Sequence, residues 1–288
     1  MRVKPLGQSP KVWQVIEKKN KDGKLMKFTI QEIPEDRYED AIQHMCTYFL
    51  ADEPTCQCLN LSLSLSLSQI IFIFRMIPKE KKLFIFYYNY SLYLFHVTFY
   101  SILFVDAKND PLFLHDINVL WRTLLPEGIS VAAFIDNPNG SKSIIAGLNV
   151  LSVDVKNQKD KLSDYQFKSE KLKNTYEILN KTKLVYERYD VDKHIYAVGL
   201  SVEPDYRGYG LSKELLKVRD LIGSAYGVPA TATAFTSMIS QKSAAGAGFE
   251  EFLTTNFADV VDKDGKEYFP NINSKAFKIM GKRINTAQ

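Results

Sequence analysis

The chain has 288 residues, 45% of them hydrophobic, which is enough for one large domain or two small ones. Its formal charge of +4 includes no dense run of Lys and Arg, so the sequence does not predict a nucleic-acid-binding surface. The N-terminal stretch lacks the apolar core of a signal peptide. The three cysteines, Cys46, Cys56 and Cys58, fit neither a disulfide framework nor a metal site. These features predict a cytoplasmic protein with reduced thiols and no metal.

Strands and helices alternate along most of the chain. The N-terminal part predicts two strands around a turn at 21–23, then a helix over about 36–50 with apolar residues at helical spacing. Further patterns predict, in order, a helix at 112–126, strands at 129–136 and 143–155, a polar-rich helix at 168–190, a strand at 194–202, a helix at 211–227, a strand at 229–235, a helix at 239–249 and two strands at 253–261 and 275–284. This order is typical of a mixed α/β sheet.

Residues 61–106 differ in composition from the rest of the chain. They begin with a Leu-Ser repeat, and Leu83–Val105 is a run of 23 residues without Asp, Glu, Lys or Arg, 10 of them Phe or Tyr. A membrane span or a pair of buried strands are two interpretations, although the Tyr, Asn, Ser and His residues inside the run make a span costly. We favour a third interpretation, translated intron, because a CT repeat encodes alternating Leu and Ser and AT-rich DNA encodes Phe, Ile, Tyr and Asn.

The stretch Val198–Leu216 places two glycines directly between a predicted strand and a predicted helix. The first backbone N–H groups of a helix have no partner within it, and they attract an anion. Gly208 and Gly210 remove side chains that would hold a phosphate away, and Arg207 adds a positive charge. The spacing fits neither a P-loop nor a dinucleotide fingerprint. The pattern therefore predicts a pyrophosphate cradle, with a simple tight turn as the alternative.

Several stretches carry a family resemblance. The residues VEPDYRGYGLSKEL resemble the pyrophosphate-binding motif of the GNAT superfamily of N-acetyltransferases. The stretches FTIQEIPEDRYEDAIQHMCTYFLADEPTC, LWRTLLPEGISVAAFI, GLNVLSV and TAFTSMISQKSAAGAGFE are similar to the insect arylalkylamine N-acetyltransferases. The resemblance implies a single GNAT domain over 25–283, after an extension or strand at 1–24. It also supports the intron interpretation, because removing about Leu61–Val105 leaves the spacing usual in the family.

The resemblance implies a GNAT fold, which is a mixed, mostly antiparallel central sheet flanked by helices. In that fold a splayed strand pair binds acetyl-CoA. The backbone of Leu200, Ser201 and Val202 would contact the pantetheine arm. The phosphates would be held by the cradle residues, Arg207, Gly208, Tyr209, Gly210, Leu211 and Ser212. No metal is implied.

The resemblance also implies three catalytic residues. Glu53, in the DEP stretch, would act as the general base that removes a proton from the amine, directly or through water. From the residues alone, a solvated surface carboxylate is the commoner interpretation of Glu53. Thr236 and Ser240 match two hydroxyl residues of the family, and four-residue spacing on a helix would put them on one face. Ser240 would assist the departing thiolate, and helix capping is the alternative role for both hydroxyls.

The function implied is transfer of the acetyl group of acetyl-CoA to the primary amine of an arylalkylamine, such as dopamine, serotonin, tryptamine or octopamine. The amine would attack directly in a ternary complex, and we expect a monomeric, cytoplasmic enzyme without a nucleic-acid partner, and without a membrane unless 83–105 is a span. The alternatives are a polyamine acceptor, a long-chain acyl-CoA donor, or an inactive CoA-binding product of a retained intron. An apolar acceptor pocket would favour arylalkylamines, and an acidic one polyamines.

Overall fold

The computed structural model describes residues 3–5, 7–58, 110–140, 142–159 and 161–286, together with two short strands at 61–62 and 104–105. An eight-stranded sheet lies at the centre, in the order β1-β2-β5-β6-β7-β8-β10-β9. Its strands are β1 (Val12–Lys19), β2 (Leu25–Glu32), β5 (Val131–Ile135), β6 (Ile144–Val155), β7 (Lys193–Val202), β8 (Ala230–Phe235), β9 (Glu250–Asn256) and β10 (Ala276–Arg283). All neighbours are antiparallel except β7 and β8. The predicted mixed, mostly antiparallel sheet is confirmed.

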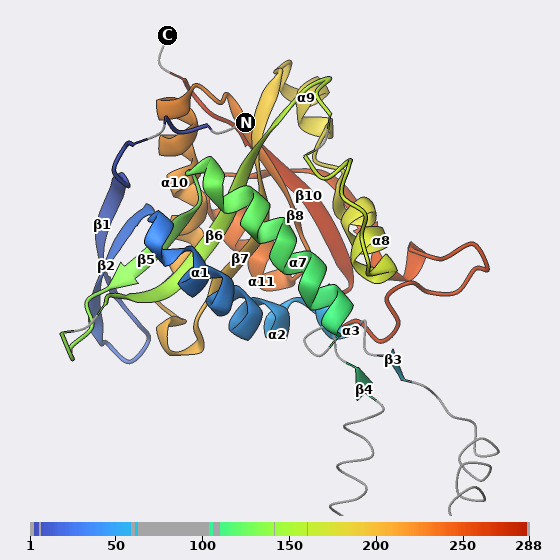
Figure 1. The fold of residues 1–288 in the computed structure, drawn as a ribbon, viewed down its shortest axis with the longest axis horizontal. Helices are drawn as coiled ribbons and strands as arrows, with labels where there is room; N and C mark the ends of the chain where they lie inside the picture. The colour runs from blue at the N-terminus through green and yellow to red at the C-terminus, as the bar shows by residue number, and fades with distance from the viewer. Residues whose placement is uncertain are drawn as a thin grey trace, which may run out of the picture.

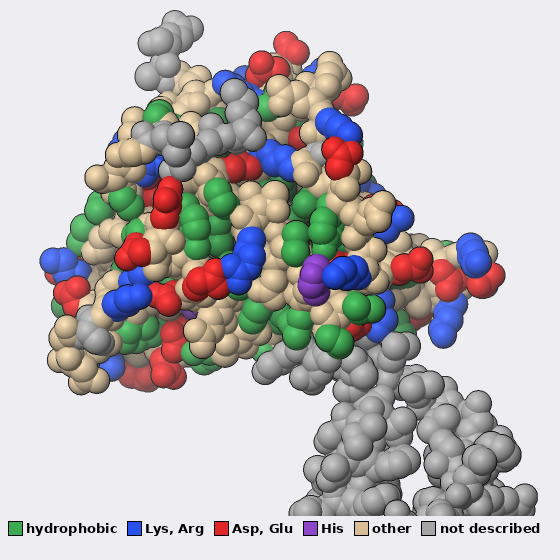
Figure 2. Space-filling model, in the orientation of Figure 1, with side chains coloured by type: hydrophobic (Ala, Val, Ile, Leu, Met, Phe, Trp, Pro, Cys, Tyr) green, Lys and Arg blue, Asp and Glu red, His purple; other side chains and the backbone are tan. Residues whose placement is uncertain are grey.

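Helices cover both faces of this sheet, with α1 and α7 on one face and α10 on the other (Figure 1). The helices are α1 (Tyr38–His44), α2 (Leu50–Asp52), α3 (Pro54–Cys58), α7 (Pro111–Leu124), α8 (Glu170–Leu179), α9 (Leu184–Tyr189), α10 (Leu211–Tyr226) and α11 (Met238–Gly246). A π-helical turn, η2 (Met45–Phe49), joins α1 to α2. On the face with α1 and α7, positive and negative side chains are interspersed (Figure 2).

The core follows from the alternation of side chains along the strands. In β5, Ala132 and Phe134 pack with α1 and α7, whereas Val131 and Ala133 pack with α10. Successive strand residues point to opposite faces, so a strand covered by helices on both sides must be apolar throughout. β5 has this character, because its first four residues are buried.

The predicted helix at 168–190 is instead two helices, α8 and α9. Asn180 leaves the helical conformation with ψ 57°, and Leu184 is 40% exposed. The physical reason is the spacing of the apolar residues. Leu184 follows Leu179 by five positions, whereas residues on one face of a helix recur every three or four. The break puts residues 180–183 in a short link beside β7, which matters for the site below.

The ends of the compositionally distinct segment lie together. The strand β3 (Leu61–Ser62) pairs antiparallel with β4 (Phe104–Val105), and Leu61 lies opposite Val105. The rest of the segment, and with it the intron interpretation and most of the run 83–105, lies outside the described residues. Within the described residues, no helix combines the length and the apolar character needed to cross a bilayer.

Candidate active site

The sheet opens between its two parallel strands. β7 and β8 pair only at Ile195 and Thr231, whereas β6 stays paired with β7 as far as Val202. From Tyr196 onward, the edge of β7 that faces β8 therefore has no strand partner among the described residues. The predicted splayed pair is present, and its opening is the wedge in which the site is built.

A bulge in β7 shapes this wedge. Val198 and Gly199 together oppose one residue of β6, between the pairs Asn149–Leu200 and Leu151–Ala197. Gly199 has φ 113°, a backbone conformation that strains any residue with a side chain, and a Cβ there would also displace the end of the Met45 side chain. The two carbonyls of the bulge are satisfied by side chains. Trp121 Nε1 donates to Val198 O at 3.0 Å, and Asn149 Nδ2 donates to Gly199 O at 2.7 Å.

A buried arginine holds the same region from behind. Arg219 of α10 is fully buried and donates from Nε and Nη2 to Asn149 Oδ1, at 3.0 and 2.8 Å. Its Nη1 donates to the hydroxyls of Thr231 and Thr233 on β8, at 3.2 and 2.8 Å. Arg219 thereby links β6 to β8 at the inner end of the wedge. The sequence patterns did not single out Arg219.

A cavity of about 170 Å³ occupies the wedge and extends under α7 and α8. Its walls are mostly apolar, and among its described lining residues Glu53 is the sole carboxylate. The apolar wall residues include Phe49, Phe113, Ile117, Leu120, Leu172 and Leu179. We call this space the acceptor cavity. All three predicted catalytic residues, Glu53, Thr236 and Ser240, line it.

Glu53 reaches the acceptor cavity because the helix before it stops there. Pro54 disfavours the helical conformation in the preceding residue, and Glu53 has φ −70° and ψ 118°. Its Oε1 accepts hydrogen bonds from Thr55 Oγ1 at 3.1 Å and Thr55 N at 3.4 Å. Burial is the largest influence on its pKa and raises it above 4.5, while hydrogen bonds from Thr236 and Thr55 act in the opposite direction. A carboxylate with a raised pKa is a stronger base.

Thr236 and Ser240 lie where β8 gives way to α11. The prediction of one shared helical face is wrong, because α11 begins at Met238 and Thr236 precedes it. Instead, Thr236 is buried and lines the same cavity as Glu53, where its hydroxyl acts to lower the pKa of the Glu53 carboxyl. Ser240 takes part in a capping box with Ser237, in which Ser237 Oγ accepts from Ser240 N at 3.1 Å. The capping role that the sequence left open is therefore present for Ser240, and its partner Ser237 could have been found from the Ser-x-x-Ser spacing.

The cradle lies at the start of α10. Gly208 and Gly210 have φ 85° and 73°, the left-handed region that favours glycine. Within the described chain no side chain caps α10, and its first amides to bond back, Lys213 N and Glu214 N, both reach Gly210 O. Leu211 and Ser212 come before Lys213, so their N–H groups have no partner within α10.

Side chains of the predicted cradle residues play different roles. Tyr209 and Leu211 are buried in the core, and the Tyr209 ring centroid lies 5.5 Å from that of Phe28. Ser212 Oγ lies 2.9 Å from Ser243 Oγ on α11. Tyr209 and Leu211 therefore have only their backbone to offer a ligand.

Of the three predicted pantetheine contacts, Leu200 lines the acceptor cavity. Ser201 and Val202 pair with Leu148 and Gly147 of β6. The buried Ser201 hydroxyl has no hydrogen-bond partner among the described residues.

Arg207 connects the cradle with the residue before Glu53. Its Nε donates to Val202 O at 3.1 Å, and its Nη2 forms an ion pair with Asp52. Nearby, the Tyr48 hydroxyl donates to Glu203 Oε1 at 3.0 Å. The loop after β7 and the end of α2 are thus joined by polar contacts, which brings the cradle and the Glu53 end of the acceptor cavity together.

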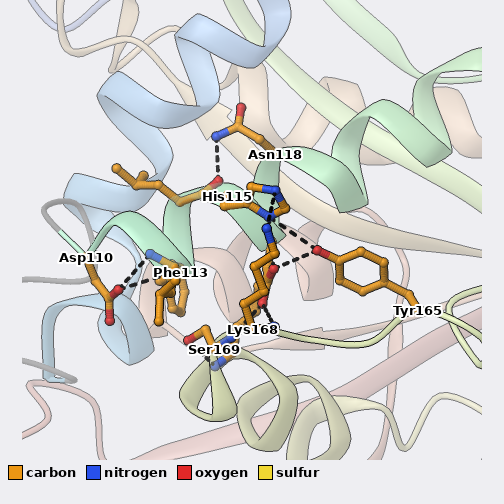
Figure 3. Close-up of polar contacts among 11 residues, drawn as sticks. Asp110, Phe113, His115, Asn118, Tyr165, Lys168 and Ser169 are labelled. Atoms are coloured by element: carbon orange, nitrogen blue, oxygen red, sulfur yellow. Dashed lines mark hydrogen bonds and ion pairs between the residues drawn. The ribbon is translucent and has the colours of Figure 1, made fainter.

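The walls formed by α7 and α8 are fixed to each other through a buried carboxylate. Asp116 of α7 accepts hydrogen bonds from the Tyr165 hydroxyl at 2.6 Å and from the N–H groups of Lys168 and Ser169 at 2.7 Å. Figure 3 shows Tyr165, Lys168 and Ser169 converging on α7 near His115. Ser169 then caps α8, so this cluster sets where α8 begins.

Cysteines and metals have no prominent place in the site. None of the three cysteines, all of them described, forms a disulfide, and Cys56 lies in the wall of the acceptor cavity. Within the described ranges, no three His, Cys, Asp or Glu side chains gather as a metal site.

The architecture was compared with known proteins. No family model matches the chain, and no curated protein matches its sequence. Among solved structures, a candidate arylalkylamine N-acetyltransferase 7 from the yellow fever mosquito Aedes aegypti aligns over 96% of this chain and 97% of its own, with 29% identity and a TM-score of 0.71. The chain has the GNAT fold, close to that of insect arylalkylamine N-acetyltransferases.

Two further GNAT structures share the fold at lower identity. The arylalkylamine N-acetyltransferase 2 of Aedes aegypti is 22% identical, covers 90% of this chain and 99% of its own, and has a TM-score of 0.62. A Drosophila melanogaster polyamine N-acetyltransferase is 12% identical, and the alignment covers 89% of this chain and 100% of the Drosophila chain, with a TM-score of 0.62. GNAT proteins with different acceptors thus share this architecture, so the acceptor must be argued from the acceptor cavity itself.

Proposed function

We propose that the protein transfers an acetyl group from acetyl-CoA to the primary amine of an arylalkylamine. The observation that carries the proposal is the meeting of Glu53 and Thr236 in the wedge between β7 and β8, beside the glycine-lined start of α10. Arg207, which precedes this helix start, forms an ion pair with Asp52, next to Glu53. A candidate base therefore lies near a helix end that suits an anion, which supports the joining of an amine to a phosphate-bearing acyl donor.

The chain offers acetyl-CoA two kinds of contact. The uncapped N–H groups at the start of α10 suit its pyrophosphate, and the unpaired edge of β7 suits the amides of its pantetheine arm. Bound there, acetyl-CoA supplies the activated acetyl thioester. Arg207 is the cationic side chain of the cradle. When acetyl-CoA binds, its guanidinium group would leave the ion pair with Asp52 and bind a phosphate group instead.

In the proposed reaction Glu53 accepts a proton from the bound ammonium group, directly or through water. This frees the nitrogen lone pair to attack the thioester carbon, so that a C–N bond forms and the C–S bond breaks. Ser240 supports return of a proton to the departing thiolate, and the acetylated nitrogen loses its second proton. Thr236 holds the Glu53 carboxylate in position. No covalent enzyme intermediate is needed.

The composition of the acceptor cavity supports an arylalkylamine over a polyamine. Phe49, Phe113 and Leu120 are typical of the wall, and burial of an aromatic ring against such residues is favourable. A polyamine carries further positive charges, and Glu53 alone would have to compensate them within the described walls of the acceptor cavity.

Turnover of acetyl-CoA with a panel of amines at several pH values tests this proposal. Glu53 must be ionised to act as base, so the rate should rise with pH through a pKa above 4.5. Glu53→Gln should lower kcat by about a hundredfold or more at pH 7, and by less at alkaline pH, where the amine loses its proton unaided. Glu39→Gln, an exposed carboxylate paired with Arg122, is the control. Full turnover by Glu53→Gln at pH 7 would refute the role of Glu53.

A further inference from the structure

A second, much smaller cavity adjoins the acceptor cavity. It measures about 10 Å³, close to the space that one water-sized group needs. The two cavities share four lining residues, Tyr176, Asn180, Thr182 and Tyr196, and the small one adds Asp154 and Lys161. We call the group Asp154, Asn180, Thr182 and Tyr196 the polar annex. It gives a mostly apolar cavity a polar end.

Three residues of the polar annex, Asp154, Asn180 and Thr182, can form further hydrogen bonds. Asp154 Oδ2 accepts from the Tyr186 hydroxyl at 2.8 Å, which leaves Oδ1 available. Asn180 and Thr182 lie in the link between α8 and α9, and neither side chain bonds to another described residue. Thr182 is 7% exposed, and both it and Asn180 line the two cavities. Polar groups that line such a space can bond to a ligand or to water.

The polar annex and Glu53 lie toward opposite ends of the parted strands. Asp154 pairs with His194, next to Ile195, where β7 and β8 are still joined. Thr236, which lines the acceptor cavity with Glu53, directly follows β8 and comes five residues after Thr231. Five strand residues rise by roughly 16 Å. The acceptor cavity connects the two ends, because Glu53 and the annex residues Asn180, Thr182 and Tyr196 all line it. A small elongated molecule can therefore meet Glu53 at one end and the polar annex at the other.

We propose that the polar annex binds the ring hydroxyl of a phenolic arylalkylamine whose amino group faces Glu53. The hydroxyl would donate to Asp154 and accept from Asn180 or Thr182. This inference rests on the proposed function, and it adds a subsite that selects among arylalkylamines. The sequence patterns did not indicate this subsite, because they predict a continuous helix where the break between α8 and α9 creates the link.

A neutral hydroxyl suits the polar annex better than a second cation does. The ammonium group of Lys161 lines the same small cavity, bound to Glu127, to Ser152 Oγ at 2.6 Å and to Val153 O at 2.7 Å. A second ammonium or guanidinium group would lie beside it and be repelled. A hydroxyl donates to Asp154 without that repulsion.

The test compares kcat/KM for tyramine and phenethylamine, which differ only in the ring hydroxyl. A hydrogen bond to a charged acceptor should make the wild-type protein prefer tyramine by about tenfold to a hundredfold. Asp154→Asn and Asn180→Ala should each reduce this ratio to about threefold or less, mainly through KM. Asp192→Asn, an exposed aspartate nearby, is the matched control and should keep the wild-type ratio.

The outcomes separate the subsite from the proposed function. Turnover of phenethylamine by the wild-type protein tests acetyl transfer alone. If phenethylamine and tyramine are both acetylated with equal kcat/KM, or if Asp154→Asn leaves the ratio unchanged, the subsite is refuted and acetyl transfer stands. If Asp154→Asn instead abolishes a preference for 1,4-diaminobutane over butylamine, the polar annex binds a second cation and the proposal is overturned.

Discussion

Removing the partner of Arg219 should destabilise the fold far more than removing Arg219 itself. Within the described residues the guanidinium forms no ion pair, and it depends on two bonds to Asn149 and one each to Thr231 and Thr233. Asn149→Leu keeps the buried charge and removes two of these bonds. Arg219→Met removes the charge together with its bonds and fills the space with an apolar side chain of similar length.

The magnitudes follow from the hydrogen bonds. A bond to a charged group contributes about 1.5–3 kcal/mol, so losing two costs about 3–6 kcal/mol, and losing the bond to Gly199 O adds about 1 kcal/mol. Arg219→Met leaves Asn149 Oδ1 without its donors, at about 1–3 kcal/mol. The double variant should be more stable than Asn149→Leu alone, because the unpaired cation is gone.

Urea unfolding at pH 7, followed by circular dichroism, measures these free energies. Arg188→Met is the control, because that arginine is half-exposed, its Nη2 lies 3.6 Å from Glu250 Oε2, and its loss should cost less than about 1 kcal/mol. The view that the buried charge dominates is refuted if Asn149→Leu and Arg219→Met lower the free energy of unfolding equally and their effects simply add in the double variant.

Two further predictions concern the cradle and the start of α11. Gly210→Ala should weaken CoA binding in calorimetry, because a side chain strains the left-handed conformation, φ 73°, in which Gly210 leads into the first amides of α10. Gly140→Ala has a similar φ of 69° but should leave the affinity unchanged, and equal affinities for both variants would count against the cradle. Ser237→Ala and Ser240→Ala should each lower the free energy of unfolding by about 1 kcal/mol, because each removes part of the capping box. Of the two variants, only Ser240→Ala should lower kcat. An equal fall in kcat for both variants would mean that Ser240 only caps α11.

Local signals in the sequence were enough to predict most of the sheet. The alternation around the 21–23 turn and the glycines at 208 and 210 predicted β1, β2 and the entry to α10, because each depends on near neighbours in the chain. The contact of Glu53 with Thr236 joins distant parts of the chain, and the residues alone gave Glu53 no more than a surface role. Only the family resemblance singled it out.

The polar network behind the wedge was missed for a related reason. Asn149 and Arg219 occur in apolar surroundings, at positions where the strand and helix patterns predict burial, but their partnership depends on how α10 crosses β6. An arginine on the apolar face of a helix therefore indicates that its guanidinium group has hydrogen-bond acceptors in the core, although the pattern does not identify them.

The parted strands have a consequence for the protein before it meets its ligands. A strand edge without a partner can recruit an extended segment of another chain, which is a route to self-association. If acyl-CoA lies along β7 as proposed, the donor acts as the missing strand, and the ligand-free protein should be both less stable and more prone to aggregate. The metabolic supply of acyl-CoA would then govern the lifetime of the protein in addition to its turnover.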